Sequence, residues 1–452
     1  MPLDLAVIGG GPKGAAIAAK AAALSAAGYD APKITIYEPH SLGASWTGRF
    51  GYTDGLQLLC TMAEHDLGYP YDRRTFGEAV AEYLFAEYSW HRFSVSAGVD
   101  ESEYGNWVLR GRRPPAHRDF ARYIEYAIVK SKARHELRSV EQLSYNYSLK
   151  KWSLSGAGWR EEFDGVVITG SIKPLPPMQN AASNQRVVDG RSFWQSIPQI
   201  RGLLQNDPDP SIVIIGAGGT GAAIAHWFIR ERIERVPITL IGREPTLHVR
   251  QVGYFEDRLF TDSLAWGRLP AQSRRAFVER LSRGVVWRQV LEALSKARNF
   301  TYESYDVLGF QPLSAPPGPG LPLGLAARLA PPNSTGAAAP PTMFLDASLF
   351  VDARGFNPWW FVELVPASSP IETALQPANH DHIIHYIDDS LAVGTQNGFP
   401  GGLHLPMLAH VRGPAAPNLM ALGWMSDCIL RPYVSGKHAL VSAFFGSPSG
   451  TP

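Results

Sequence analysis

The chain has 452 residues, a hydrophobic content of 45% and a formal net charge of +1. That length has room for about three domains, and the hydrophobic residues can bury a substantial core. The balanced charge gives no electrostatic basis for binding nucleic acid or an anionic membrane surface, and no apolar run reaches membrane-spanning length. Cys60 and Cys428 form no C-x-x-C pair, which excludes a dithiol centre and a cysteine-based metal site. We therefore expect a protein without a metal, in the reducing environment of the cytoplasm.

The N-terminus has the pattern of a strand, a glycine-rich turn and a helix. The run 5–8 is followed by Gly9-Gly10-Gly11-Pro12-Lys13-Gly14, a small-residue helix and a second strand that ends at Glu38. In the motif G-x-G-x-x-G, here Gly9, Gly11 and Gly14, the backbone turns tightly and approaches a pyrophosphate at a helix N-terminus. A carboxylate in the place of Glu38 accepts hydrogen bonds from ribose hydroxyls. This unit therefore predicts a site for FAD or NAD.

The next segments are expected to cover that cofactor. Residues 43–120 are rich in aromatic side chains and poor in periodicity, which is typical of loops and short helices. A helix is expected over 120–130, hairpin strands over 137–163 and a buried strand over 163–170.

A second glycine turn follows about two hundred residues after the first. The apolar run 212–215 precedes Gly216-Ala217-Gly218-Gly219-Thr220-Gly221, so Gly216, Gly218 and Gly221 fit the same motif. The next strand, 238–241, ends in Gly242-Arg243 with no acidic residue in the ribose position. Arg243 would pair with a ribose 2′-phosphate, which predicts NADPH, and the alternative is a solvated loop charge. Two dinucleotides in one chain indicate hydride transfer between them.

The rest of the chain suggests how the two units are connected. We expect one or two helices over 274–297 and a mobile surface loop over 311–341, which is rich in Pro, Gly and Ala. The apolar strand at 349–355 resembles the strand at 166–170, so we expect the NADPH domain to be inserted into the FAD domain. We further expect residues 418–424 to finish the first sheet. The predicted fold is α/β with two Rossmann-like domains, divided as 1–200, 205–345 and 346–452, in a possible homo-oligomer.

Several short motifs then occur in an order that is typical of one family. They are Gly43-Ala44-Ser45-Trp46, Asp66-Leu67-Gly68-Tyr69-Pro70-Tyr71, Tyr254-Phe255-Glu256-Asp257-Arg258-Leu259-Phe260, Gly355-Phe356-Asn357-Pro358-Trp359, Leu403-His404-Leu405-Pro406 and Ser426-Asp427-Cys428. With them the chain resembles the flavin-dependent N-hydroxylating monooxygenases of siderophore biosynthesis, closest to the lysine hydroxylases of the mycobactin and nocobactin pathways. The resemblance implies FAD, NADPH and molecular oxygen, with hydroxylation of the side-chain amine of L-lysine or L-ornithine through a flavin hydroperoxide. The cofactor supplies the hard chemistry.

The same resemblance assigns roles to particular residues. Gln57 matches a glutamine near the isoalloxazine, and Trp46 packs either against that ring or in the ordinary core. His65 stands where the family has a lysine that faces the amino-acid carboxylate. Asp257 stands where the family has an asparagine near substrate and nicotinamide. These two departures fit a diamine, a guanidino compound or another amino acid at least as well as lysine or ornithine.

Other functions remain to be weighed. Baeyer–Villiger relatives carry F-x-G-x-x-x-H between their two turns, but the comparable stretch here ends in Trp194. The cysteines exclude a disulfide reductase. A non-enzymatic flavoprotein that senses redox state would bind FAD without NADPH-driven bleaching. We interpret the remaining candidate histidines as structural: His117, His226, His404 and His438.

Overall fold

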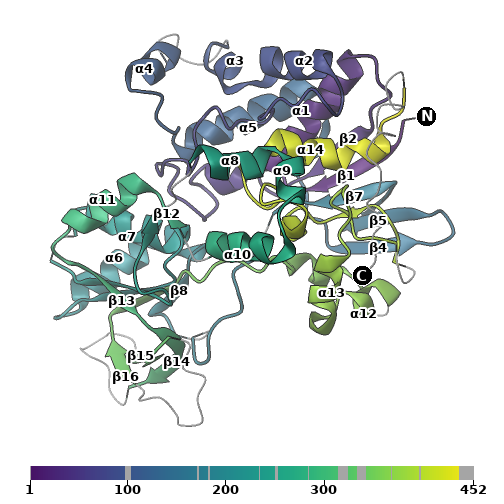
Figure 1. Ribbon diagram of the computed structural model, residues 1–452. Helices are drawn as coiled ribbons and strands as arrows, with labels where there is room; N and C mark the ends of the chain where they lie inside the picture. Colours follow the sequence, from purple (N-terminus) through teal and green to yellow (C-terminus); the bar gives the residue numbers. More distant parts are fainter. Residues whose placement is uncertain are drawn as a thin grey trace.

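The fold is organised around two parallel five-stranded sheets, which form two lobes in this computed structural model (Figure 1). The structure describes residues 2–96, 103–170, 173–181, 184–233, 235–249, 253–282, 285–313, 324–332, 343–367, 369–395 and 399–436. His438 lies outside the described residues. Among them, no helix combines the length and apolar character needed to cross a bilayer, and no three potential metal ligands come together.

The first sheet has the strand order β18-β7-β1-β2-β3. Its strands are β1 (Asp4–Ile8), β2 (Lys33–Tyr37), β3 (Arg134–Glu136), β7 (Gly165–Ile168) and β18 (Leu403–His404). An antiparallel sheet of β4 (Gln142–Asn146), β5 (Lys151–Gly156) and β6 (Trp159–Phe163) confirms the expected hairpins. Because α1 (Pro12–Ala26) is built mainly of alanine, it is buried on nearly every side and neighbouring helices approach it closely.

The helices around α1 come from distant parts of the chain. They are α2 (Glu78–Tyr88), α5 (His117–Ser131) and α14 (Leu422–Leu430), with α3 (Trp90–Ser94) and α4 (Glu103–Leu109) beyond them (Figure 1). The expectation that residues 418–424 form the closing strand is wrong. Those residues lead into α14, and the strand that closes the sheet is β18, which pairs with β7. An apolar run next to glycine does not distinguish a buried strand from the start of a buried helix.

The second sheet has the order β13-β10-β9-β17-β8 and confirms the second dinucleotide-binding unit. Its strands are β8 (Val187–Asp189), β9 (Ile212–Ile215), β10 (Ile238–Gly242), β13 (Phe300–Ser304) and β17 (Leu349–Asp352). Helices α6 (Ile197–Asn206), α7 (Gly219–Arg230) and α11 (Arg288–Lys296) accompany it. The sheet takes β8 and β17 from outside the expected bounds 205–345, because β17 pairs with both β8 and β9.

The expectation of a mobile loop over 311–341 is also wrong in its middle. Strand β15 (Leu325–Ala330) lies between β14 (Asp306–Pro312) and β16 (Met343–Asp346) in an antiparallel sheet. Leu325, Ala327 and Leu329 are buried with Phe310 and Phe350 in one apolar cluster. The composition of the flanking residues concealed this short alanine-rich strand, and residues 314–323 and 333–342 lie outside the described part.

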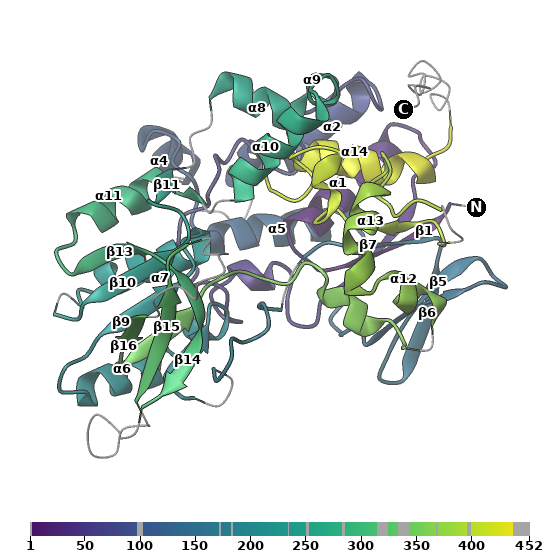
Figure 2. The same cartoon turned by 60° about the horizontal axis from the view of Figure 1, so that its bottom comes forward.

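A helical insert, residues 253–282, connects the two lobes. It comprises α8 (Tyr254–Thr261), α9 (Ser263–Gly267) and α10 (Ala271–Ser282), between β11 (His248–Val249) and β12 (Val285–Val286) of the second lobe. Although the chain enters it from the second lobe, the insert packs over α14 of the first lobe in both views (Figures 1 and 2). Phe260 and Phe277 of the insert share an apolar cluster with Met420 and Trp424. The helices α12 (Pro370–Ala374) and α13 (His380–His385) complete the first lobe.

Candidate functional site

The first glycine turn has the geometry of a pyrophosphate cradle. Gly9 has φ +117°, where an L side chain is strained, and a Cβ there would collide with Thr169. A Cβ on Gly14 would lie 2.6 Å from the carbonyl oxygen of Gly9, so helix α1 could not start so close to β1. A Cβ on Gly11 would meet no heavy atom within 4 Å. The turn therefore leaves open space beside Gly11, at the N-terminus of α1, where an anion is favoured.

Glu38 lies at the end of β2, directly beside this turn. Its carboxylate accepts hydrogen bonds from the backbone N–H groups of Gly10, at 3.2 Å, and His40, at 3.4 Å. Burial raises the pKa of Glu38 above its ordinary value, although the two amides oppose that shift. The carboxylate is thus held next to the cradle, in the place that a ribose hydroxyl donor requires.

Gln57 presents a buried side-chain NH2 group that has no hydrogen-bond partner among the described residues. Along the extended segment 56–63, even-numbered residues are exposed and odd-numbered residues are buried, so the side chain of Gln57 points inward. Only 6% of Gln57 is exposed, and its Nε2 donates to no atom of the described residues. Its backbone is fixed at both ends, by Asp54 Oδ1 at 3.1 Å and by the N–H of His117 at 2.8 Å. Because an unsatisfied buried donor is costly, this amide fits a bound polar ring such as isoalloxazine.

Trp46 supports this region from the side. Its ring packs edge-to-face against His117, with centroids 4.7 Å apart, and against Phe120, at 5.4 Å. Of the two interpretations left open by the sequence, these contacts favour packing against α5.

The second glycine turn repeats the geometry of the first. Gly216 has φ +114° and a Cβ there would collide with the backbone of Ala353, while a Cβ on Gly221 would collide with the carbonyl of Gly216. A Cβ on Gly218 would meet nothing within 4 Å. Arg243 follows β10 and is 78% exposed, with its Nε 2.7 Å from Asp306 Oδ1. The guanidinium is therefore accessible at the carboxyl edge of the sheet, where a nucleotide would lie.

His65 and Asp257 come together from different parts of the chain. The Nδ1 atom of His65 lies 2.6 Å from Thr61 Oγ1, and its ring lies 4.5 Å from that of Tyr69. Burial and then the charge of Asp257 raise the pKa of Tyr69, which places Asp257 near the same tyrosine. Tyr69 thus has a ring contact with His65 and an electrostatic interaction with Asp257, the two residues that the sequence suggested for the substrate site.

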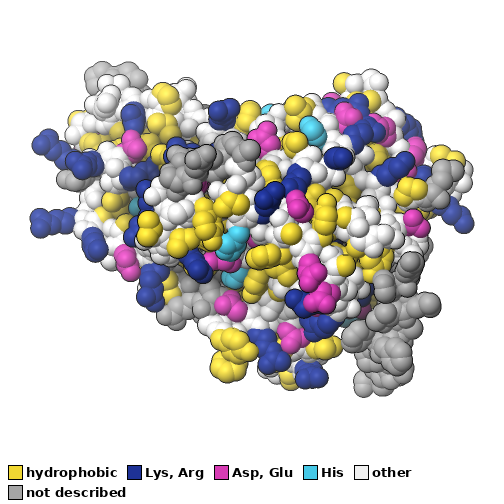
Figure 3. Space-filling view, turned by 90° about the horizontal axis from the view of Figure 1, so that it is seen from above, with side chains coloured by type: hydrophobic (Ala, Val, Ile, Leu, Met, Phe, Trp, Pro, Cys, Tyr) yellow, Lys and Arg dark blue, Asp and Glu magenta, His cyan; other side chains and the backbone are white. Residues whose placement is uncertain are grey.

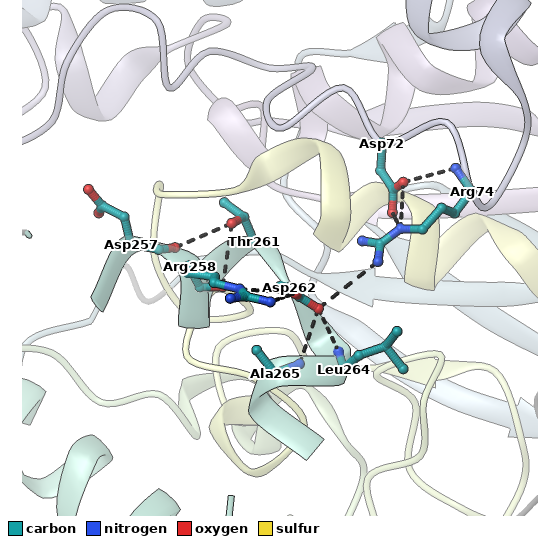
Figure 4. Close-up of polar contacts among 8 residues, drawn as sticks. All are labelled: Asp72, Arg74, Asp257, Arg258, Thr261, Asp262, Leu264 and Ala265. Atoms are coloured by element: carbon teal, nitrogen blue, oxygen red, sulfur yellow. Dashed lines mark hydrogen bonds and ion pairs between the residues drawn. The ribbon is translucent and has the colours of Figure 1, made fainter. Parts of the chain in front are cut away.

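Asp257 is carried by α8, and the end of that helix is anchored by Asp262 (Figure 4). Asp262 Oδ1 accepts the N–H groups of Leu264, at 3.0 Å, and Ala265, at 3.1 Å, and so caps α9. Its carboxylate also lies 3.3 Å from Arg258 Nε and 4.0 Å from Arg74 of the first lobe. Figure 4 shows the carboxylate of Asp257 pointing away from this network, which leaves it to face other partners.

The surface of the molecule is apolar in part. Figure 3 shows positive and negative side chains interspersed over one face, with hydrophobic side chains gathered toward its middle. Tyr254 and Phe255, at the start of α8, are the most exposed of the aromatic residues near Asp257, at 74% and 81%.

A cavity of about 260 Å³ lies elsewhere, between α12, α13 and Tyr147, and contains none of the expected site residues.

Comparison with known proteins decides the family. No protein-family model matches the chain. The chain is 31% identical to the L-lysine N6-monooxygenase MbtG of Mycobacterium sp. (strain MCS), over 95% of both chains. It is 29% identical to MbtG of Mycobacterium tuberculosis, over 94% of both. The chain belongs to the L-lysine N6-monooxygenase family.

A solved structure supports the same assignment for this N-monooxygenase. The lysine monooxygenase NbtG from Nocardia farcinica superposes with a TM-score of 0.75 at 29% identity, over 95% of this chain and all of that one. The resemblance inferred from the motifs is thereby confirmed, as are the two-domain fold and the enzyme class, a flavoprotein monooxygenase that uses FAD and NADPH.

Two polar features of this N-monooxygenase were missed from the sequence. Asp54 and Arg230 form an ion pair between the lobes, although 176 positions separate them in the sequence. Lys13 is buried inside the first glycine turn. A signal existed for Lys13, because a lysine in a helix of small apolar residues has few ways to reach solvent.

Proposed function

We propose that this chain hydroxylates the side-chain amine of L-lysine, with FAD at the first glycine turn and NADPH at the second. The observation that carries the proposal is the 31% identity to a lysine N6-monooxygenase over 95% of the chain. The open space beside Gly11 and the unpartnered amide of Gln57 support FAD in the first lobe. The exposed guanidinium of Arg243 supports a phosphorylated nicotinamide dinucleotide in the second.

The cofactors supply the redox chemistry, in which NADPH gives a hydride and reduced FAD activates dioxygen for transfer to nitrogen. The residues of this chain have a binding and orienting role. Gly11 and Glu38 would hold the pyrophosphate and ribose of FAD, and Gln57 would donate a hydrogen bond to the flavin ring. His65, Tyr69 and Asp257 would orient the amine, which must be neutral to act as a nucleophile.

The experiment is a panel of primary amines offered to the purified protein with FAD, NADPH and dioxygen. We expect L-lysine to give the fastest hydroxylamine formation, at a rate that matches oxygen uptake. Oxygen uptake without hydroxylamine for any amine would contradict N-hydroxylation. Absence of NADPH-driven flavin bleaching would instead favour a redox-sensing flavoprotein.

A second candidate is the hydroxylation of a diamine. Asp257 favours it, because a carboxylate near Tyr69 attracts a second ammonium group and repels the carboxylate of an amino acid. His65 is also a weaker partner for a carboxylate than a lysine would be. A diamine with the chain length of lysine should then be turned over faster than lysine itself, and the same panel decides between the two.

A further inference from the structure

Lys13 lies inside the first glycine motif, in the first turn of α1, yet its side chain points into the protein. It is 5% exposed. Its ammonium donates to the carbonyl oxygens of Ala416, at 2.7 Å, and Asn418, at 3.1 Å. These two carbonyls belong to the segment that leads into α14. The side chain thus ties the C-terminal part of the first lobe to the turn that would hold a dinucleotide.

This ammonium has no counter-ion among the described residues. Among the described residues no carboxylate pairs with Lys13, whereas Lys20, further along the same helix, forms a buried ion pair with Asp427 of α14. An isolated buried ammonium is costly, because two carbonyl dipoles do not replace a counter-charge. Burial alone lowers the pKa of Lys13 to about 7.

No charged group on the neighbouring elements accounts for that shift. The charged side chains on the elements that pack against α1 are Lys20 of α1 itself, Lys33 of β2 and Glu38 at its end, Glu78, Glu82 and Glu87 of α2, Arg118, Asp119, Arg122, Glu125 and Lys130 of α5, and Asp427 of α14. None of them contributes to the pKa of Lys13. Because burial is the cause of the shift, an anion bound nearby would be needed to restore the ordinary pKa of this ammonium.

We propose that Lys13 is a positioning residue for flavin binding, whose ammonium pins residues 416–418 to the first glycine turn and is stabilised by the pyrophosphate of the bound dinucleotide. The inference rests on the proposed function only in taking that dinucleotide to be FAD. The motif places the pyrophosphate at the start of α1, where Lys13 is located and where the space beside Gly11 is open. An anion in that position offsets the cost of the buried cation.

Flavin binding should therefore be linked to the uptake of a proton by Lys13. Without FAD, Lys13 loses its proton as the pH rises through about 7. A pyrophosphate nearby raises the pKa of Lys13, so FAD binding takes up a proton on the alkaline side of that value. FAD affinity should then fall as the pH rises, by at most about tenfold per pH unit.

The experiment measures FAD binding to the apoprotein from neutral to alkaline pH, followed by the change in flavin fluorescence, without NADPH or amine. Lys13→Met should weaken binding about tenfold at neutral pH and abolish its pH dependence. The matched control is Lys20→Met combined with Asp427→Leu, which removes the other buried lysine of α1 together with its partner. It should keep the wild-type pH dependence. Wild-type affinity and wild-type pH dependence in Lys13→Met would overturn the proposal.

A measurement on the unaltered protein covers the case in which Lys13→Met does not fold. Calorimetric titration of the apoprotein with FAD, in buffers of different ionisation enthalpy, counts the protons exchanged. Net uptake at alkaline pH is expected, and the absence of uptake contradicts the proposal. Because no substrate is present, this result is independent of whether the chain hydroxylates lysine.

Discussion

Asp54 and Arg230 form an ion pair that joins the two dinucleotide-binding lobes. Asp54 Oδ1 accepts the N–H groups of Leu56, at 2.9 Å, and Gln57, at 3.1 Å, and its other oxygen binds the guanidinium of Arg230. Arg230 is the last residue of α7, the helix that begins at the second glycine turn. One carboxylate thus holds both the turn that presents Gln57 and the helix that follows the NADPH motif.

Breaking this pair should slow the transfer of electrons between the cofactors. Asp54 is 11% exposed at its side chain, so its bond to Arg230 is better shielded than an ordinary surface pair. Arg230→Met should lower the rate of anaerobic flavin reduction by NADPH about tenfold, because reacting groups tolerate little displacement. Asp54→Asn should have the same effect, since the amide oxygen still caps the turn. Stopped-flow bleaching of the flavin measures both.

Arg201→Met is the matched control for that prediction. Arg201 pairs with Glu231 at the end of the same helix, but both residues belong to the second lobe. Its loss should leave flavin reduction unchanged. Equal slowing in Arg201→Met and Arg230→Met would point to damage within α7 instead of a role between the lobes.

Arg243→Ala should reduce the preference for NADPH over NADH. A charge-assisted bond to the 2′-phosphate is worth about 1.5–3 kcal/mol, and the 78% exposure of Arg243 places the effect at the lower end. The KM for NADPH should rise about tenfold, with little change for NADH. Asp306→Asn removes the carboxylate that pairs with Arg243 and should leave the KM for NADPH unchanged or lower it. An equal rise in the KM for NADPH and for NADH would contradict a contact with the 2′-phosphate and would show that Arg243 only stabilises the fold.

The strand β15 should be needed for stability, contrary to what its flanking composition suggests. Leu325 is fully buried between β14 and the core of the second lobe. Leu325→Ala should lower the free energy of unfolding by about 2–5 kcal/mol, measured by denaturant unfolding. Met343→Ala, on the neighbouring β16, alters a half-exposed side chain. It should change the free energy of unfolding by about 0.5 kcal/mol or less. If Leu325→Ala and Met343→Ala had similarly small effects on the free energy of unfolding, β15 would not be needed for stability.

His404 should make the fold sensitive to acid. It lies fully buried between the Ser390 carbonyl, 2.7 Å from Nδ1, and the Tyr433 hydroxyl, 2.7 Å from Nε2. Burial lowers its pKa to about 4, against about 6.5 in the unfolded chain. The unfolded state therefore takes up the proton first as the pH falls, and stability is lost between these two values, by up to about 3 kcal/mol.

The test compares the unfolding free energy at neutral and acid pH. His404→Phe should be less stable than wild type at neutral pH, because two hydrogen bonds are lost, but it should lose less on acidification. His135→Gln, at an exposed position on β3, serves as the control and should keep the wild-type slope. An unchanged slope in His404→Phe would show that the acid sensitivity originates elsewhere, for instance at His117.

Substitutions at His65 and Asp257 should shift the choice of amine. His65→Lys and Asp257→Asn introduce the residues that the resemblance to the family implies at these positions. If both side chains flank the bound amine, each change should raise the ratio of kcat/KM for L-lysine over that for a diamine, and the two together should raise it further. Hydroxylamine formation measures the ratio. No change in either variant would remove these residues from the substrate site.

The sequence determined the family and the two dinucleotide turns, because each depends on contiguous residues. Gly9, Gly14, Gly216 and Gly221 take strained or crowded positions that only glycine tolerates. Periodicity likewise predicted α5 and the hairpins after it. Local composition gave the wrong prediction at Leu325–Ala330. The segment forms a strand because it packs against buried neighbours, and not because of its intrinsic propensity.

Only the tertiary structure decided which distant residues act together. The pairing of Asp54 with Arg230, the approach of Asp257 to Tyr69 and the burial of Lys13 against Ala416 each join segments that are far apart in sequence. Burial sets the charge state of such groups, and it depends on the packing of several elements at once. A motif therefore specifies where a cofactor can bind, while the fold decides which charges surround it.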